Sequence, residues 1–247
     1  MKSTNKIAVY TAIFGPYDGL LPQPKLANVD YICFTDQPFR SKTWKIVPIT
    51  PVFEDLTRNA RMIKVLPHRY LPDYEVSVFM DGNFLILKDI SPLVAHALSE
   101  RPMAIFDHNK VVDKRNCIYD EYDAILALQQ RRGKLKDDPD TMRHQVERYR
   151  MEGYPEQNGL ISSGVLLRKH HDPHVRKTME TWWNEICEGS KRDQLSFNYA
   201  AWKNQFDPVL LPYDLRNNEF FYLLGKHRKN NLAKLIKFRL KRFFGLG

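Results

Sequence analysis

The chain has 247 residues, of which 43% are hydrophobic and 27% are charged, so it can bury the core of one large globular domain. Its three cysteines are odd in number, widely spaced and without a CxxC pair, which argues against a disulfide framework and a zinc module and for a reducing compartment. The net charge of +9 is concentrated in residues 226–242, which hold eight Lys and Arg residues and no acid. The basic pI therefore says little about the body of the chain.

The first segments predict short strands. The apolar run in residues 6–14 is too short to cross a bilayer and lacks a cleavage-like site, so we expect a first strand there, closed by a turn at residues 15–19. Further strands are expected at 31–36 and 44–49. A turn after a first strand is where doubly wound folds bind nucleotides. The chain has neither a GxGxxG nor a Walker sequence, so neither a Rossmann dehydrogenase nor a P-loop enzyme is supported.

A helix is expected over residues 56–65 and ends before Pro67. Arg58, Arg61 and Lys64 recur at i, i+3 and i+6 in this helix, and three cations on roughly one face can meet a diphosphate. The alternative is an ordinary basic face exposed to solvent.

The segment around Asp81 and Asn83 carries the strongest chemical signal. Residues 76–80 form an apolar run of the kind found in strands buried on both faces, and a second run follows at 84–87. A buried acid is costly unless the strand emerges at the edge of the sheet, and Gly82 lets the backbone turn or approach a ligand there. In an extended segment the two side chains point to the same side, which suits a divalent cation and a phosphate. The alternative is a plain Asp-Gly-Asn turn.

The rest of the chain continues the alternation of helices and strands. We expect a helix at 91–98, a strand at 103–106, a helical excursion at about 120–152 with a break near 133–139, a strand at 159–167, and helices at 172–186 and 190–202. The excursion is interpreted either as a lid on the acceptor side or as a plain insertion. Trp182 and Trp183 are expected in the core. These elements predict an α/β domain over residues 1–225 with a mixed, mainly parallel sheet flanked by helices.

Two later segments supply candidate site residues. The small residues Ser162, Ser163 and Gly164 would leave room for a ligand against the sheet. Asp193 and Gln194 fall in the first turn of the expected helix at 190–202, where the helix dipole stabilises an anion. The alternative is that they only make a good helix start.

The order of these segments resembles the nucleotide-sugar-dependent glycosyltransferases of the GT-A fold. The most specific parts are Arg58-Asn-Ala-Arg61, Met80-Asp-Gly-Asn83 and Arg192-Asp-Gln-Leu-Ser-Phe197, and the similarity covers roughly residues 6–225. It is closest to a glycosyltransferase-like family first described as a domain of unknown function, with members in plant wall-polysaccharide and bacterial surface-polysaccharide pathways. A looser similarity extends to the retaining galactosyltransferase and glycogenin group.

The resemblance implies a set of site residues. Asp193 would hold donor hydroxyls or serve the reaction centre, and Gln194 would offer its amide to the oxocarbenium-like transition state; these two are the candidate catalytic residues. The acceptor or donor-sugar group is His108, Arg115, Tyr119 and Glu121. The donor-binding group is Thr11, Ala12, Phe14, Tyr17, Asp36, Arg58, Arg61, Lys64, Asp81, Gly82, Asn83, Ser163 and Gly164.

The metal expectation also follows from the resemblance. The wider fold carries an Asp-x-Asp motif that binds Mn²⁺ or Mg²⁺, and here Asp81 and Asn83 stand in its place. An amide oxygen can bind a metal ion but has no charge, so the expected affinity falls. The wider fold often adds a late histidine, and His227 is the candidate third ligand, although it could equally be part of the basic tail.

The resemblance leaves the stereochemistry open. We expect retention of configuration, with transfer of a sugar from a nucleotide sugar to a saccharide or lipid-linked acceptor. If the reaction inverts instead, a carboxylate must deprotonate the acceptor, and Asp193, Glu121 and Asp107 are the candidates. A non-catalytic carbohydrate- or nucleotide-binding module of the same fold is the alternative, which Asn83 favours.

Residues 226–247 form a basic tail with an amphipathic pattern. Its apolar residues approximate one helical face, which predicts binding to an anionic membrane and a location in the cytoplasm at the membrane periphery. Nucleic-acid binding is the rival, but the body has no DNA or RNA motif, so no nucleic-acid partner is expected. A helix docked on the domain, or a disordered tail, remains a further alternative. The apolar residues are Leu232, Leu235, Ile236, Leu240, Phe243 and Phe244.

Overall fold

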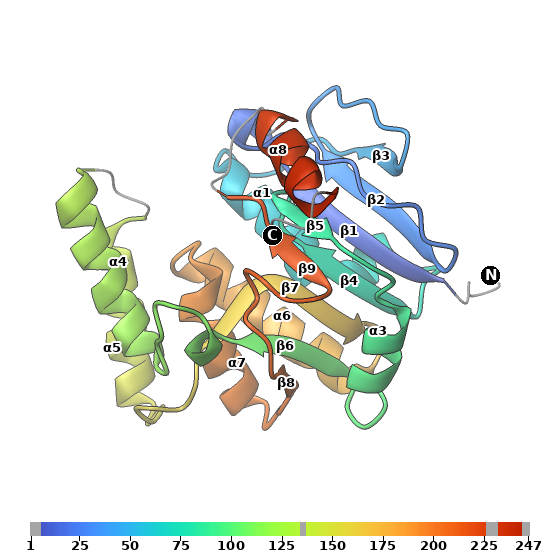
Figure 1. The fold of residues 1–247 in the computed structure, drawn as a ribbon. Helices are drawn as coiled ribbons and strands as arrows, with labels where there is room; N and C mark the ends of the chain where they lie inside the picture. Colours follow the sequence, from blue (N-terminus) through green and yellow to red (C-terminus); the bar gives the residue numbers. More distant parts are fainter. Residues whose placement is uncertain (1–5, 134–136, 226–231, 244–247) are drawn as a thin grey trace.

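The computed structural model describes residues 6–133, 137–225 and 232–243, and a seven-stranded sheet lies at its centre (Figure 1). The strand order is β3-β2-β1-β4-β7-β6-β8, and every strand except β7 runs in the same direction. This confirms the mixed, mainly parallel α/β prediction and is consistent with a GT-A-like fold. The strands are β1 (Ile7–Ile13), β2 (Val29–Thr35), β3 (Trp44–Pro48), β4 (Val76–Met80), β6 (Met103–Asp107), β7 (Ile161–Lys169) and β8 (Val209–Leu211).

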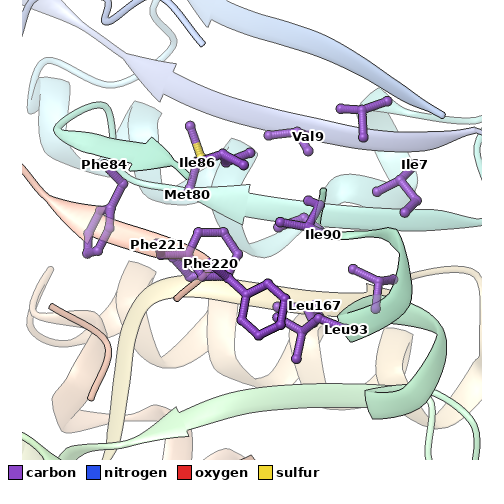
Figure 2. Close-up of a cluster of buried hydrophobic side chains, with 14 of the residues drawn as sticks. Ile7, Val9, Met80, Phe84, Ile86, Ile90, Leu93, Leu167, Phe220 and Phe221 are labelled. Carbon is purple, nitrogen blue, oxygen red and sulfur yellow. The ribbon is translucent and has the colours of Figure 1, made fainter. Parts of the chain in front are cut away.

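Helices and a small second sheet cover the two faces of the central sheet. Side chains alternate along each strand, so Ile7 and Val9 of β1 join one core while Ala8 and Tyr10 join the other. The first core lies under α3 (Ser91–Ala97) and the two-stranded sheet of β5 (Phe84–Ile86) and β9 (Phe221–Leu223), as Figure 2 shows. The second lies under α1 (Leu56–Val65), α2 (Pro67–Tyr70), α6 (Pro173–Glu188) and α7 (Phe197–Lys203).

The helix boundaries follow from side-chain caps that the sequence supplies. The Asp55 carboxylate accepts a hydrogen bond of 2.8 Å from Thr57 N at the start of α1, and Asp172 does the same for His174 N and Val175 N at the start of α6. The predicted Asp172 cap is confirmed, as is the burial of both tryptophans of α6. All three cysteines are free, with Cys187 the exposed one.

The predicted helical excursion is a hairpin of α4 (Ile118–Arg132) and α5 (Pro139–Met151). It projects from the rest of the molecule at the left of Figure 1 and carries its own small apolar clusters. Short 3-10 turns occur at η1 (Gly15–Tyr17), η2 (His108–Lys110) and η3 (Asp193–Leu195). The turn η3 contacts α4, so the excursion is anchored beside Asp193.

The tail helix α8 (Leu232–Phe243) docks on the small sheet of β5 and β9. Leu235 is 2% exposed against Leu85 and its neighbours, and the Phe238 ring stacks on Tyr222 at 4.3 Å. Ile236 and Leu240 are about half exposed, so the described apolar residues divide between a docked and an exposed side, and the docking agrees with the alternative of a helix packed on the domain. The side chains of Leu232 and Phe243 and all of Phe244 lie outside the described residues. No described helix is long and apolar enough to cross a membrane.

Candidate active site

Polar side chains gather where the parallel strands end. Asp36 follows β2, Asp81 follows β4, and Asp107 closes β6. Because β7 runs the other way, its first residues lie at this same edge, which brings Ser163 to the site. The carboxyl edge of an open α/β sheet is where such folds bind ligands.

Asp193 is the buried centre of this edge, with 3% of its surface exposed. Its Oδ2 forms an ion pair with Lys64, accepts a hydrogen bond of 2.9 Å from Ser163 Oγ, and lies 3.4 Å from Arg61 Nε. Its backbone carbonyl accepts a hydrogen bond of 2.9 Å from Trp182 Nε1. Two elements far from residue 193 in sequence, α1 and β7, therefore converge on its carboxylate.

The surrounding charges determine the ionisation of Asp193. Burial alone would raise the pKa of its carboxyl group, but Arg61 and Lys64 outweigh that effect and hold the pKa well below its usual range. Burial would likewise lower the pKa of Arg61, and Asp193 and Asp81 raise it instead. Asp193 is thus a carboxylate at neutral pH, held between two cations.

Arg58 lies apart from the other two cations of α1. Its guanidinium donates to the carbonyls of Ile186, Cys187 and Gly189 at the carboxyl end of α6, the last at 2.9 Å. Residues at i, i+3 and i+6 drift by about 60° per step around a helix, so the first and last of them do not share a face. The structure therefore brings Arg61 and Lys64 to Asp193, and it does not bring Arg58 there.

The segment before Asp193 is held from two further directions. The Asp137 carboxylate accepts from Ser190 Oγ and, at 2.8 Å, from Lys191 N. Gln145 of α5 accepts a hydrogen bond of 2.9 Å from Ser190 N. The helical excursion thus fixes the approach to Asp193.

Asp81 offers an uncommitted carboxylate. In the described part of the chain no side-chain hydrogen bond or ion pair holds it, yet it lies close enough to raise the pKa of Arg61. Partial burial raises the pKa of the neighbouring Tyr17, and the charge of Asp81 acts in the same direction. A Cβ on Gly82 would lie 3.0 Å from Ile13 Cδ1, so the glycine permits close packing under the carboxylate.

Asn83 is buried, and its amide is half satisfied. Nδ2 donates a hydrogen bond of 2.7 Å to Gly225 O, while Oδ1 has no hydrogen-bond partner among the described residues. A buried acceptor without a partner is costly unless a ligand completes it. Asn83 therefore presents an oxygen two residues after Asp81, and its Nδ2 ties this segment to Gly225 at the end of the domain.

The remaining predicted donor residues divide between the turn after β1 and the strand itself. Asp36 accepts a hydrogen bond of 2.8 Å from Gly15 N and so fixes the turn that carries Tyr17. Thr11 in β1 and Phe14 directly after it are buried, and Ala12 of β1 is partly buried against the core that α1 and α6 cover. They shape the wall under the site.

A bulge in β7 sets the position of Ser163. The pairing with β6 shifts register between Ile105 and Phe106, and the residues at Ser163 and Gly164 fall in the shift. The Phe84 ring packs against Gly164 so closely that a Cβ at this position would lie 3.1 Å from Phe84 Cε2. In this structure the glycine admits a side chain from the other sheet.

The second predicted group forms a charged network. Arg115 Nε donates to Glu121 Oε2 at 2.6 Å, and its guanidinium lies 3.0 Å from His108 Nε2. Arg192 lies 3.6 Å from the other Glu121 oxygen and also lowers the pKa of Asp193, so the two groups adjoin. Tyr119 is instead buried in the excursion and donates to Tyr154 O at 3.0 Å.

Comparison with known proteins places this arrangement in a family. The model of the TOD1/MUCI70 family, glycosyltransferase-like domain, matches residues 33–221. The chain belongs to this family. It is 22% identical over 227 residues to the probable hexosyltransferase MUCI70 of Arabidopsis thaliana, an alignment that covers 80% of this chain and 37% of the relative. The chain therefore spans little more than a third of the length of that relative.

Two side-chain oxygens at this edge of the sheet have the chemistry of ligands for a divalent cation. The Asp81 carboxylate and Asn83 Oδ1 are two oxygens without a competing partner in the described chain. Mg²⁺ commonly takes one or two protein oxygens and completes its shell with water and substrate phosphates. The pair fits that pattern, although the described residues contain no cluster of three His, Cys, Asp or Glu side chains. His227 lies outside the described residues.

Arg192 belongs to the motif at residues 192–197 but was not among the candidate site residues predicted from the sequence. It adjoins Asp193 in the chain and lies between Asp193 and Glu121 in space. Arg192 could have been predicted from the run Lys191-Arg192-Asp193, because it directly precedes a candidate catalytic acid in the chain. Gln194, by contrast, was predicted, and its Nε2 donates a hydrogen bond of 2.9 Å to Ile161 O.

Proposed function

We propose that the protein transfers a hexosyl group from a nucleotide sugar to a saccharide or lipid-linked acceptor, in the synthesis of a surface polysaccharide or glycolipid. The observation that carries the proposal is the buried, ionised Asp193 held by Arg61 and Lys64 at the carboxyl edge of the sheet. Membership of a glycosyltransferase-like family supports the same reaction class.

The donor would lie across this edge. Its diphosphate would face Arg61 and Arg192, with Asp81 and Asn83 holding Mn²⁺ or Mg²⁺ against it. The cation would supply charge neutralisation for the departing diphosphate. Arg61 is only partly exposed beside Asp193, so its charge acts in a poorly hydrated setting where electrostatic stabilisation is strong.

The ionisation of Asp193 bears on its role. A carboxylate whose pKa is held well below its usual range is a poor proton acceptor, so it suits stabilising positive charge on the sugar or holding donor hydroxyls. That role fits a retaining reaction. For an inverting reaction Asp107 would be the better base, because Glu121 is engaged by Arg115 and Arg192.

The test is a thermal-shift panel of nucleotide sugars with and without Mn²⁺, followed by release of nucleoside diphosphate. A bound donor stabilises the native state, so at least one nucleotide sugar should raise the melting temperature. Asp81→Asn removes one charge and keeps the shape, and it should weaken metal-supported donor binding by about tenfold or more. The exposed Asp123 of α4 gives the matched control Asp123→Asn, which should bind as the wild type does.

The outcomes separate the proposal from its alternative. If no nucleotide sugar binds under any metal condition, the transferase proposal fails. Binding without turnover across a broad set of acceptors would instead favour a non-catalytic module of the same fold, the possibility that the uncharged Asn83 raises.

The exposed side of α8 supports a second part of the proposal, attachment to an anionic membrane on its cytoplasmic face. Ile236 and Leu240 are about half exposed there, and Lys237 and Arg239 are exposed on the same helix. Apolar side chains flanked by cations suit the interface of an anionic bilayer. A helix held next to β5 and β9 would bring the site close to a lipid-linked acceptor.

A further inference from the structure

A cavity of about 740 Å³ lies beside the candidate active site. Its lining residues come mainly from the end of β6, the start of β7, α7 and the loop that leads to β8. Pockets of a few hundred to a thousand Å³ hold small organic ligands, so its size suits a short saccharide. Its lining includes Asp107, Asn116, Ile161, Asn198, Trp202 and Gln205.

One residue joins the cavity to the reaction centre. Ile161 N donates a hydrogen bond of 3.1 Å to Asn198 Oδ1 in the cavity wall. The carbonyl of the same residue accepts the bond from Gln194 Nε2. A ligand in the cavity therefore lies next to the turn that carries Gln194 and Asp193.

The cavity has an aromatic platform. Trp202 is 37% exposed, whereas the other three tryptophans of the chain are each less than 10% exposed. The Tyr154 and Tyr199 rings lie 5.6 Å and 5.9 Å from it and fix its orientation. A rigid, partly exposed indole offers an apolar face at low entropic cost, which suits the C–H face of a sugar ring.

The polar groups around this platform match hydroxyls. In the described part of the chain no hydrogen bond holds the side-chain amides of Asn116 and Gln205. An amide both donates and accepts, as a sugar hydroxyl does, so the two can pair in either direction.

The charges of the lining exclude an anionic sugar. Lys203 is the cation of the cavity, and its Nζ is bound to Glu152 at 2.9 Å. Asp207 is paired with Arg101, whereas the Asp107 carboxylate accepts a hydrogen bond of 2.9 Å from Asn109 N and forms no ion pair among the described residues. A uronic acid would meet that carboxylate without a free cation to offset the repulsion.

We propose that this cavity binds a neutral saccharide and presents one of its hydroxyls to the reaction centre as the acceptor. The proposal rests on the transferase function and adds the class of its acceptor. If the reaction inverts, the proposal also selects Asp107 as the base, because Asp107 lines the cavity.

The test starts with an array of neutral and uronic-acid-containing oligosaccharides probed with the full-length protein. Each bound glycan is then titrated while tryptophan fluorescence and its quenching by iodide are followed, since Trp202 is the exposed tryptophan. We expect neutral glycans to bind and to shield Trp202 from iodide. Trp202→Ala and Asn116→Ala should each weaken binding by about tenfold or more, and Trp202→Phe by much less.

The control is Val112→Ala, an exposed residue outside the lining, which should bind glycans as the wild type does. Nucleotide-sugar stabilisation should be unchanged in Trp202→Ala, which separates this cavity from the donor site. Glycan binding that survives Trp202→Ala, or a preference for uronic acids, overturns the proposal. If a nucleotide sugar binds but no glycan shields Trp202, the acceptor proposal is overturned and the transferase function still stands. If a glycan shields Trp202 but no nucleotide sugar binds, the cavity binds saccharides and the transferase function is overturned.

Discussion

At the scale of single residues, two opposite charges share a space that is nearly closed to water. Lys64 and Asp193 are 1% and 3% exposed, and each would be costly to bury alone. Ser163 and Arg61 complete the set of partners around the carboxylate. Removing one member of such a pair leaves the other charge uncompensated, typically at about 3–5 kcal/mol. Substitutions of Asp193 or Lys64 therefore change stability and activity together. Substitutions of residues that position these two side chains separate the effects better.

Arg58 is such a residue. Its guanidinium holds the carbonyls of Ile186 and Gly189, which begin the segment leading to Asp193. Arg58→Ala should lower kcat by about tenfold or more and leave the donor KM within about threefold, because the lost contacts orient a site residue. Unfolding free energy should fall by about 1–3 kcal/mol, as expected for buried carbonyls that lose a charged donor.

Hydrogen exchange gives a readout that does not depend on activity. The amides of residues 187–193 should exchange faster in Arg58→Ala, since the segment opens locally more often. Arg69→Ala is the control, because Arg69 is half exposed and its guanidinium lies 4.0 Å from Glu180, away from residues 187–193. A large rise in donor KM with unchanged kcat would instead assign Arg58 to donor binding.

At the scale of elements, the sequence predicts what carries a strong local pattern. Continuous apolar runs predicted β1, β2 and β4, and the Asp172-Pro173 cap predicted the start of α6. It predicted neither β8 nor β9. Each is only three residues long, so neither shows a period of its own. β8 pairs with β6 and β9 pairs with β5, and a local sequence pattern does not reveal such long-range pairing.

The tail helix shows the same limit and leads to a prediction. Its period is helical, but the sequence does not reveal that Leu235 packs on β5 while Ile236 faces outward. Lys237→Ala with Arg239→Ala should weaken binding to phosphatidylserine vesicles by about thirtyfold, because each cation near an anionic surface is worth about 1 kcal/mol. Vesicle co-sedimentation measures the loss, and added salt should reduce wild-type binding as well.

A charge-matched control lies at the other edge of the sheet. Lys169→Ala with Lys177→Ala removes two exposed cations from the end of β7 and from α6. This variant should bind vesicles as the wild type does. Equal losses in the two double variants would mean that net charge, and not the exposed side of α8, governs the association.

At the scale of the whole molecule, the fold assembles a site from positions that sequence patterns leave separate. Asp81 was predicted at the end of a strand and Asp193 in the first turn of a helix, but the convergence of Arg61 and Ser163 on Asp193 depends on the strand order and on the bulge in β7. A bulge changes which way a side chain points without altering composition or period. That is why the residue types could be predicted and their contacts could not.

Burial also makes the whole fold sensitive to acid through His170. The side chain is fully buried, and its Nε2 lies 3.1 Å from Leu71 O, while Nδ1 has no partner among the described residues. Burial lowers its pKa from 6.5 to about 3, with Arg168, His171 and His68 acting in the same direction. The unfolded chain therefore binds the proton more readily, so this contribution to stability is full above about pH 6.5 and is lost as the pH falls towards 3.

His170→Gln keeps a donor for Leu71 O and cannot ionise. Its unfolding free energy should fall less steeply between pH 6.5 and pH 4.5 than that of the wild type, by roughly 1 kcal/mol per pH unit at most. Urea denaturation at fixed ionic strength measures both slopes, and an unchanged m-value shows that the same surface is exposed on unfolding. His144→Gln removes an exposed imidazole from α5 and should keep the wild-type slope. Because the carboxylates titrate alike in all three proteins, equal slopes for His170→Gln and the wild type would refute the assignment to His170.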